Sequence, residues 1–246
     1  MTRPGGRVPQ STPHIDGGNP AKGVRLRTPN EKIFLCRDAL CFYEVSSILE
    51  QRGDFMAIPA EKVKYSFADC LTWGESVRAE IIDGEVYLMS PPKTQHQRVL
   101  MALAAQLHNY LDGKKCEVFP APFGVRLFEE TGDNPEDVDT MVEPDVSVVC
   151  EPNQLDEYGC KGAPAMVIEI LSPSTQRHDR ITKFNLYQKA RVKEYWIVDP
   201  ISQTVQVFLL NDVGFLCPHE AYGKEDTAKV NVLDGCLVEL SKVFAE

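Results

Sequence analysis

Two short apolar segments, each carrying one carboxylate, constrain the fold of this chain more than any other feature. Residues 145–150 read Asp-Val-Ser-Val-Val-Cys, and residues 166–171 read Met-Val-Ile-Glu-Ile-Leu. Apolar, β-branched runs of this length are typical of strands buried on both faces. A carboxylate there is costly unless it is paired, protonated or bound to a cation. In neighbouring strands, Asp145 and Glu169 would form a metal site suited to phosphodiester chemistry.

Each carboxylate also has a structural interpretation. Asp145 follows Pro144 and could open a strand at its solvated end. Glu169 could be the buried partner of an Arg or Lys side chain. For either residue alone the structural interpretation is the simpler one. The pair, together with the segment that follows it, favours a site.

Length and charge narrow the class of protein. At 246 residues the chain can bury a full core, and we expect one globular domain with extensions. The net charge of −10 argues against nonspecific coating of nucleic acid, because phosphate contacts need Lys and Arg. It is compatible with a nuclease, whose metal ligands are themselves acidic. No apolar run has membrane-spanning length and no signal peptide is evident, so we expect a cytoplasmic protein without a membrane partner.

The eight cysteines form no CxxC pair, and most lie in apolar surroundings. We therefore expect reduced, buried thiols rather than a zinc site or a disulfide framework.

The N-terminal segment differs in composition from the rest. Residues 1–30 hold five Pro, five Gly and five Lys or Arg against one acid, a net charge of +4. We expect residues 1–55 to be a disordered extension, or to precede a true start at Met56. The intact mass of the native protein would decide between these two. The globular domain is expected over residues 64–244.

Hydrophobic periodicity predicts a mixed sheet flanked by helices, an α/β (α+β) domain. Asp83-Gly84 is the signal of a tight hairpin between residues 78–82 and 85–89. Helices are expected at residues 94–111 and 175–190, and further strands at residues 115–119, 124–128, 194–198 and 205–210. In the second helix, apolar side chains that recur at helical spacing should face the sheet: Ile181, Phe184, Tyr187 and Ala190.

The second helical segment is basic within an acidic protein, with six Lys or Arg against two acids over residues 176–195. Lys183 could pair with Asp179 one turn before it on a solvated face. Alternatively, Lys183 reaches back to the two carboxylates while Arg177 and Arg180 contact a phosphate backbone.

Three polar residues upstream are second-tier candidates. Glu80 lies in the predicted hairpin and could point toward the same cleft. His96 and Gln95 lie near the start of the first long helix, where a polar histidine is usually a surface or capping residue.

Several ordered motifs resemble a known family. They comprise Glu143-Pro144-Asp145-Val146, residues 167–175, Lys183 with Tyr187, residues 194–200, and an upstream set at residues 80–85 and 90–99. Over residues 64–244 this pattern resembles the Uma-two family of restriction-type endonucleases.

The resemblance implies a restriction-endonuclease-like fold and the PD-(D/E)xK active-site plan. In that plan Asp145, Glu169 and the backbone carbonyl of Ile170 would bind Mg²⁺ or Mn²⁺. Leu171 stands where the motif has lysine, and Lys183 is the expected substitute. The additional helix acid of the superfamily would be replaced by Glu80 or by the pair Gln95-His96.

The function expected from the resemblance is a Mg²⁺-dependent endonuclease that hydrolyses DNA. Two alternatives stay open: a catalytically inactive binding module, which Leu171 and the acidity favour, and a metal-dependent phosphoesterase with a small substrate. Nucleases of this fold often pair to cut two strands, so a homodimer is compatible with the resemblance.

Overall fold

The computed structural model describes residues 62–73, 77–173 and 178–245. Contacts divide the chain into Met1–Gly53 and Asp54–Glu246, and every described residue belongs to the second unit. The predicted extension over residues 1–55 and the proposed start at Met56 therefore lie outside the described residues.

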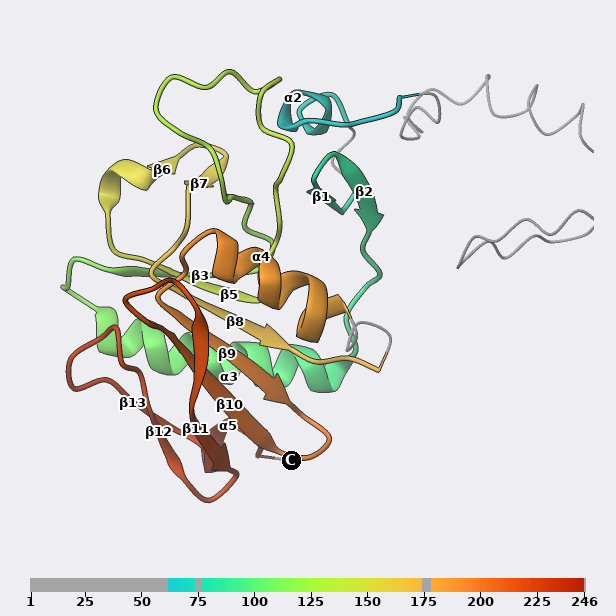
Figure 1. Cartoon of the computed structure of the whole chain (residues 1–246). Helices are drawn as coiled ribbons and strands as arrows, with labels where there is room; N and C mark the ends of the chain where they lie inside the picture. The colour runs from blue at the N-terminus through green and yellow to red at the C-terminus, as the bar shows by residue number, and fades with distance from the viewer. Residues whose placement is uncertain (1–61, 74–76, 174–177, 246) are drawn as a thin grey trace, which may run out of the picture. The chain divides into compact units, whose positions relative to one another are not determined.

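The domain is built on a six-stranded sheet with the order β11-β10-β9-β8-β5-β3 (Figure 1). β8 and β9 are parallel neighbours, and the other four pairs in this sheet are antiparallel. The strands are β3 (Glu117–Pro120), β5 (Val146–Val149), β8 (Met166–Ile170), β9 (Glu194–Asp199), β10 (Thr204–Leu210) and β11 (Leu216–Gly223).

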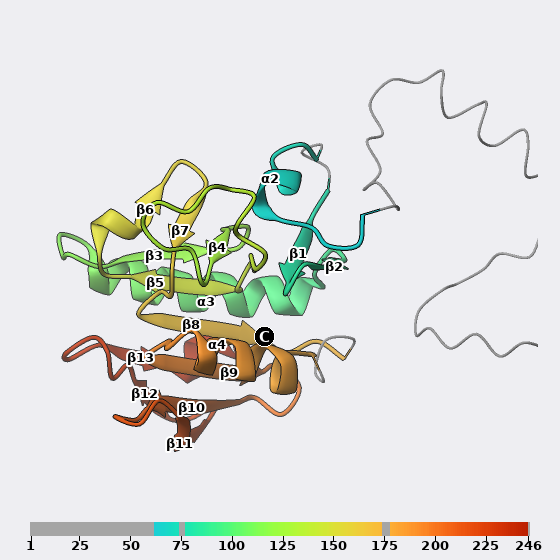
Figure 2. The ribbon, with the colours of Figure 1, turned by 45° about the horizontal axis from the view of Figure 1, so that its top comes forward.

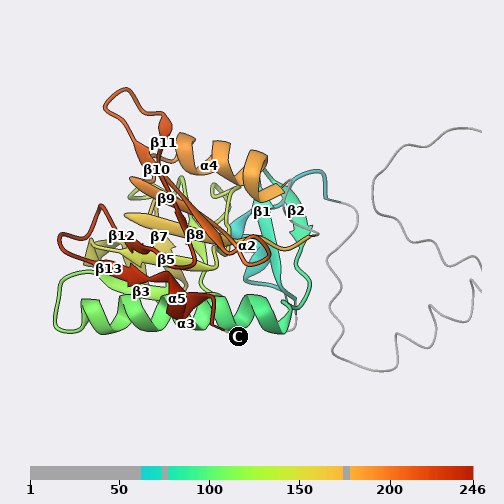
Figure 3. The same cartoon turned by 90° about the horizontal axis from the view of Figure 1, so that it is seen from below.

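Helices cover both faces of this sheet, as Figure 3 shows. On one face lies α3 (Thr94–Leu111), whose buried residues Val99, Leu103 and Leu107 pack against alternate side chains of the strands. On the other face a π-helix, η2 (His178–Lys183), runs directly into α4 (Phe184–Lys189). This three-layer arrangement leaves β5 and β8 buried on both sides, which confirms the mixed α+β class expected from their composition.

Smaller elements surround the central sheet. Figure 2 shows the hairpin of β1 and β2 beside the N-terminal end of α3. Hydrogen bonds join this hairpin to the segment before β5, because Ile81 and Met141 exchange both backbone bonds at 2.8 Å. The remaining elements are α2 (Phe67–Cys70), β1 (Ala79–Ile82), β2 (Glu85–Leu88), β4 (Val125–Arg126), η1 (Pro152–Gln154), β6 (Leu155–Asp156), β7 (Gly159–Lys161), β12 (Thr227–Lys229), β13 (Leu237–Glu239) and α5 (Leu240–Val243).

One predicted helix differs from the observed one. The segment 175–190 was expected to be a regular α-helix with Ile181, Phe184 and Tyr187 facing the sheet. Its first described part is instead a π-helix, and Ile181 is 54% exposed, so that orientation is wrong for Ile181. Tyr187 is fully buried, as the spacing predicted.

The expectation that all cysteines are reduced is also wrong. Cys116 and Cys150 form a disulfide. The register of β3 and β5 pairs Glu117 with Val149, so the next position outward places the two cysteines opposite each other. Cys70, Cys160, Cys217 and Cys236 are free thiols, and Cys36 and Cys41 lie outside the described residues.

None of the helices in the described part of the chain is both long and apolar enough to cross a membrane.

Candidate functional site

The two predicted carboxylates lie on neighbouring chain segments at the carboxyl end of β8. β5 and β8 are antiparallel neighbours with Val146 opposite Ile168, so one position further out Asp145 lies opposite Glu169. In Figure 1 this end of β8 lies at the same edge of the domain as the N-terminal end of α3 and the hairpin of β1 and β2. Three separate parts of the chain can therefore supply side chains to one place.

Asp145 is held from two sides. Its Oδ2 accepts the backbone N–H of Ile170 at 2.7 Å, which takes the place of a ladder bond beyond the end of β5. The same oxygen lies 3.2 Å from Nε2 of His96, in the first turns of α3. The side chains of Asp145 and His96 are 16% and 13% exposed, so this acid is the part of the site that solvent reaches.

Glu169 is buried and receives two donors on one oxygen. Its Oε1 accepts the hydroxyl of Tyr187 at 2.5 Å and lies 2.9 Å from Nζ of Lys183. Lys183 and Tyr187 are four residues apart across the junction of η2 and α4, a spacing that puts both on one helical face. Burial, with the neighbouring carboxylate of Glu169 adding to it, raises the pKa of Tyr187 well above its usual 10, so the hydroxyl stays a donor.

Lys183 also contacts Glu80, the third acid of the site. Its Nζ lies 2.8 Å from Oε1 of Glu80 on β1, and both side chains are about 5% exposed. Oε1 of Glu80 in turn accepts the backbone N–H of Glu143 at 2.9 Å. The hairpin is therefore joined both to the helix that carries Lys183 and to the segment that leads into Asp145.

We call Glu80, His96, Asp145, Glu169, Lys183 and Tyr187 the site cluster. Its three carboxylates and one ammonium give a formal charge of −2 when His96 is neutral. Among residues 62–73, 77–173 and 178–245, no group of three or more His, Cys, Asp or Glu side chains is placed to hold a metal ion. A cation here would rest on two carboxylates, with backbone and water oxygens completing its shell.

Comparison with known proteins identifies the family. The model of the Uma2 family, described as "Putative restriction endonuclease", matches residues 67–240. This chain belongs to the Uma2 family. The match includes the whole site cluster and confirms the resemblance expected over residues 64–244.

Two relatives show how far the likeness extends. The "Uncharacterized protein slr1290" of Synechocystis sp. is 30% identical over 154 residues, which cover 61% of this Uma2 chain and 77% of that protein. A crystal structure of "a putative nuclease" from Anabaena variabilis is 18% identical and superposes with a TM-score of 0.56, covering 74% of this chain and 98% of the other. At that identity the second likeness establishes the shared fold alone.

The structure brings some predicted residues of this Uma2 protein together and leaves others apart. Asp145, Glu169, Lys183, Glu80 and His96 all belong to the site cluster. Gln95 is directed elsewhere: its Nε2 donates to the carbonyl of Pro200 at 3.2 Å and so joins α3 to the turn after β9.

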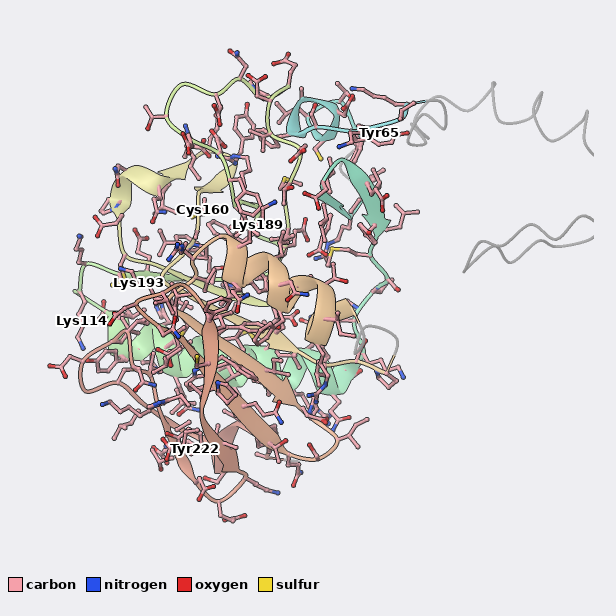
Figure 4. The ribbon with its side chains drawn as sticks, viewed as in Figure 1. Tyr65, Lys114, Cys160, Lys189, Lys193 and Tyr222 are labelled. Atoms are coloured by element: carbon pink, nitrogen blue, oxygen red, sulfur yellow. A yellow bond between two sulfur atoms is a disulfide. The ribbon has the colours of Figure 1, made fainter. Side chains whose placement is uncertain are left out.

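The basic residues of the second helix are spread along its length. Arg180 is exposed, and its Nη1 donates to Gln206 on β10 at 3.3 Å. Arg177 lies outside the described residues. Figure 4 labels Lys189 at the far end of α4 and Lys193 just beyond it. Of this basic segment, Lys183 is the residue whose contacts place it in the site cluster.

Sequence reasoning assigned no chemical role to Tyr187. Its position in an apolar, helically spaced set predicts a core residue, and its ring is indeed buried. The signal for a second role is the four-residue spacing from Lys183, since a helix that directs Lys183 at a carboxylate directs Tyr187 there too.

Proposed function

We propose that this Uma2 protein is a metal-dependent endonuclease that hydrolyses phosphodiester bonds of DNA with Mg²⁺ or Mn²⁺. The observation that carries the proposal is the placement of Asp145 and Glu169 at the same end of neighbouring strands, with Lys183 in contact with Glu169. Two acids and a lysine at the end of a sheet are the functional groups that the PD-(D/E)xK plan uses.

The donor set suits a hard divalent cation. Asp145 and Glu169 would supply carboxylate oxygens, and the carbonyl of Ile170 would supply a third. The N–H of Ile170 points to Asp145, and in an extended strand the N–H and C=O of one residue point the same way. Mg²⁺ is usually held by one or two carboxylates and keeps several waters, which fits a site lacking a third ligating side chain.

The excess negative charge supports the same assignment. The site cluster has a formal charge of −2 in surroundings that are largely buried, and such charge is costly without a counter-ion. When bound, the cation would polarise the scissile phosphate and lower the pKa of a coordinated water. Lys183 would stabilise the negative charge that develops on the phosphate, as a preorganised donor in a site from which water is partly excluded.

The main argument for an inactive module is that Leu171 replaces the motif lysine, and the position of Lys183 argues against it. Leu171, at the position of the motif lysine, is 4% exposed and packs in the apolar cluster on the α4 side of the sheet. The ammonium reaches Glu169 from the following helix instead. The exposed Arg180, and Arg177 beyond the described residues, remain predicted contacts to the DNA backbone, and a homodimer remains a prediction.

A cleavage assay on supercoiled plasmid and on single-stranded DNA, with Mg²⁺, Mn²⁺ or EDTA, tests this function. We expect cleavage that needs the cation and that Asp145→Asn and Glu169→Gln abolish. Glu151→Gln is the matched control, because Glu151 is an exposed acid just beyond β5 that pairs with Lys115. Cation-independent cleavage, or full activity in either site variant, would exclude this site. Hydrolysis of small phosphodiesters without any DNA cleavage would favour the phosphoesterase alternative.

A further inference from the structure

Lys183 is shared between two buried carboxylates. Its Nζ lies 2.9 Å from Oε1 of Glu169 and 2.8 Å from Oε1 of Glu80. The proposed function assigns Glu169 to the cation but leaves Glu80 without a role. A buried glutamate that touches the lysine of the site requires an explanation of its own.

Glu80 has a second contact that points to a positioning role. Its Oε1 accepts the backbone N–H of Glu143, two residues before Asp145. The same hairpin holds Glu143 through Arg78, whose Nη2 lies 2.6 Å from Oε2 of Glu143. Oε1 of Glu80 therefore contacts both Lys183 and the segment that leads to Asp145, the other proposed metal ligand.

A cation on Glu169 changes what holds Lys183. The ammonium and a divalent cation would share one carboxylate and repel each other, and this repulsion is strong where water is largely excluded. Glu80 supplies a carboxylate on the other side of Nζ. Glu80 would then keep Lys183 in the site while Glu169 holds the cation.

We infer that Glu80 is a positioning residue, which holds Lys183 and the backbone before Asp145 in place while the cation is bound. This inference rests on the proposed function and adds the hairpin of β1 and β2 to the catalytic unit. Glu80 itself is not assigned to the cation or to the substrate.

The variant Glu80→Gln separates positioning from metal binding. It keeps an oxygen that can accept the N–H of Glu143, and it leaves Lys183 and Glu169 as a neutral pair, so the fold is expected to persist. We expect Mn²⁺ to bind in calorimetry with the Kd of the wild type, while kcat for DNA cleavage falls about 100-fold at unchanged KM. Glu85→Gln, an exposed acid on β2 of the same hairpin, is the control and should change neither quantity.

Combination with Lys183→Met tests whether Glu80 acts through the lysine. In that background Glu80→Gln should cause no further loss of kcat, because the group that it positions is already absent. Glu80→Asp keeps the charge but withdraws it from Nζ, and should lose activity as Glu80→Gln does. This second variant covers the case in which Glu80→Gln fails to fold.

The outcomes separate this inference from the proposed function. Loss of Mn²⁺ binding in Glu80→Gln, as in Glu169→Gln, would make Glu80 a ligand and overturn the positioning role. An equal fold-loss from Glu80→Gln with and without Lys183 would show a merely structural effect and overturn it as well. If the wild type neither binds Mn²⁺ nor cleaves DNA, the proposed function fails first.

Discussion

Glu169 and Glu194 are two buried glutamates in the parallel neighbours β8 and β9, and they are satisfied in different ways. Glu194 accepts hydrogen bonds from three neutral donors: the indole of Trp196 at 2.7 Å, the amide of Asn231 at 3.3 Å and the backbone N–H of Val232 at 2.8 Å. Glu169 shares a lysine with a second acid and faces a third across the sheet.

The difference shows what distinguishes the proposed metal ligand Glu169 from a glutamate buried among neutral donors. Neutral donors around Glu194 join β9 to the loop between β12 and β13, and burial raises the pKa of Glu194. The oxygens of Glu194 are therefore satisfied by neutral donors. Glu169 and Glu80 share the one ammonium of Lys183, which leaves negative charge that a cation could neutralise.

Substitution of Lys183 should destabilise the site cluster more than any other single change described below. Lys183→Met leaves Glu80 and Glu169 buried without their cation, and we expect the free energy of unfolding in EDTA to fall by about 3–5 kcal/mol. Mn²⁺ should restore part of this loss, because it supplies the missing positive charge. Urea unfolding with and without Mn²⁺ measures both effects. Lys189→Met, at an exposed site on the same helix, should change little, and an equal loss there would refute the explanation.

Glu194→Gln should destabilise the protein without changing its affinity for Mn²⁺. The amide nitrogen cannot accept a hydrogen bond, so one of the buried donors loses its acceptor, at a cost of about 1–3 kcal/mol. Urea unfolding gives the loss, and calorimetry should show unchanged Mn²⁺ binding. Weakened Mn²⁺ binding in this variant would show that the two glutamates are not independent.

The pH dependence of the stability of wild type and Glu194→Gln provides a further test of how Glu194 differs from Glu169. Because the pKa of Glu194 is raised above its usual 4.5, the folded chain keeps this proton at pH values where the unfolded chain has lost it. The stability contributed by Glu194 is therefore largest below pH 4.5 and falls as the pH rises through the raised pKa. The free-energy difference between wild type and Glu194→Gln should be larger at acid than at neutral pH, and the opposite trend would contradict the raised pKa.

Tyr187→Phe should have a smaller effect, confined to the site. Loss of the hydroxyl removes one donor from Oε1 of Glu169, and loss of such a supporting bond typically weakens metal binding about 10-fold. Mn²⁺ calorimetry measures it. Tyr222→Phe is the control, since its hydroxyl contacts Glu220 on the hairpin of β10 and β11 (Figure 4). Unchanged Mn²⁺ affinity in Tyr187→Phe would show that Glu169 needs no such support.

Arg180→Ala should have the smallest effect. If this exposed residue contacts one phosphate, its loss lowers the salt dependence of DNA binding by about one unit of slope. Fluorescence anisotropy at several salt concentrations, with Ca²⁺ in place of Mg²⁺, measures the slope. Lys114→Ala, beyond the other end of α3 (Figure 4), should leave the slope unchanged. An identical slope in Arg180→Ala and wild type would remove Arg180 from the interface.

Patterns of local spacing predicted much of the fold. The helix over residues 94–111 has the predicted bounds, because its apolar positions recur every three or four residues. The two carboxylate strands were predicted by β-branched runs, and the contact between Lys183 and Glu169 is one of the two alternatives that the sequence left open.

The remaining features depend on tertiary contacts that local patterns do not encode. Glu80 meets Lys183 because Ile81 pairs with Met141, and that register is set by packing over 60 positions of chain. Cys116 and Cys150 meet through the register of β3 and β5 in the same way. Glu194 begins an apolar strand as plainly as Glu169 interrupts one, and only their surroundings in the fold distinguish them.

Calorimetric titration of Mn²⁺ into the wild type and into Glu169→Gln tests the central claim most directly, because metal binding needs no knowledge of the target DNA. We predict that the wild type binds Mn²⁺ and that Glu169→Gln, which keeps the shape of the side chain but removes its charge, does not. Equal binding by both proteins, or no binding by the wild type, would contradict the assignment of Asp145 and Glu169 to a metal site.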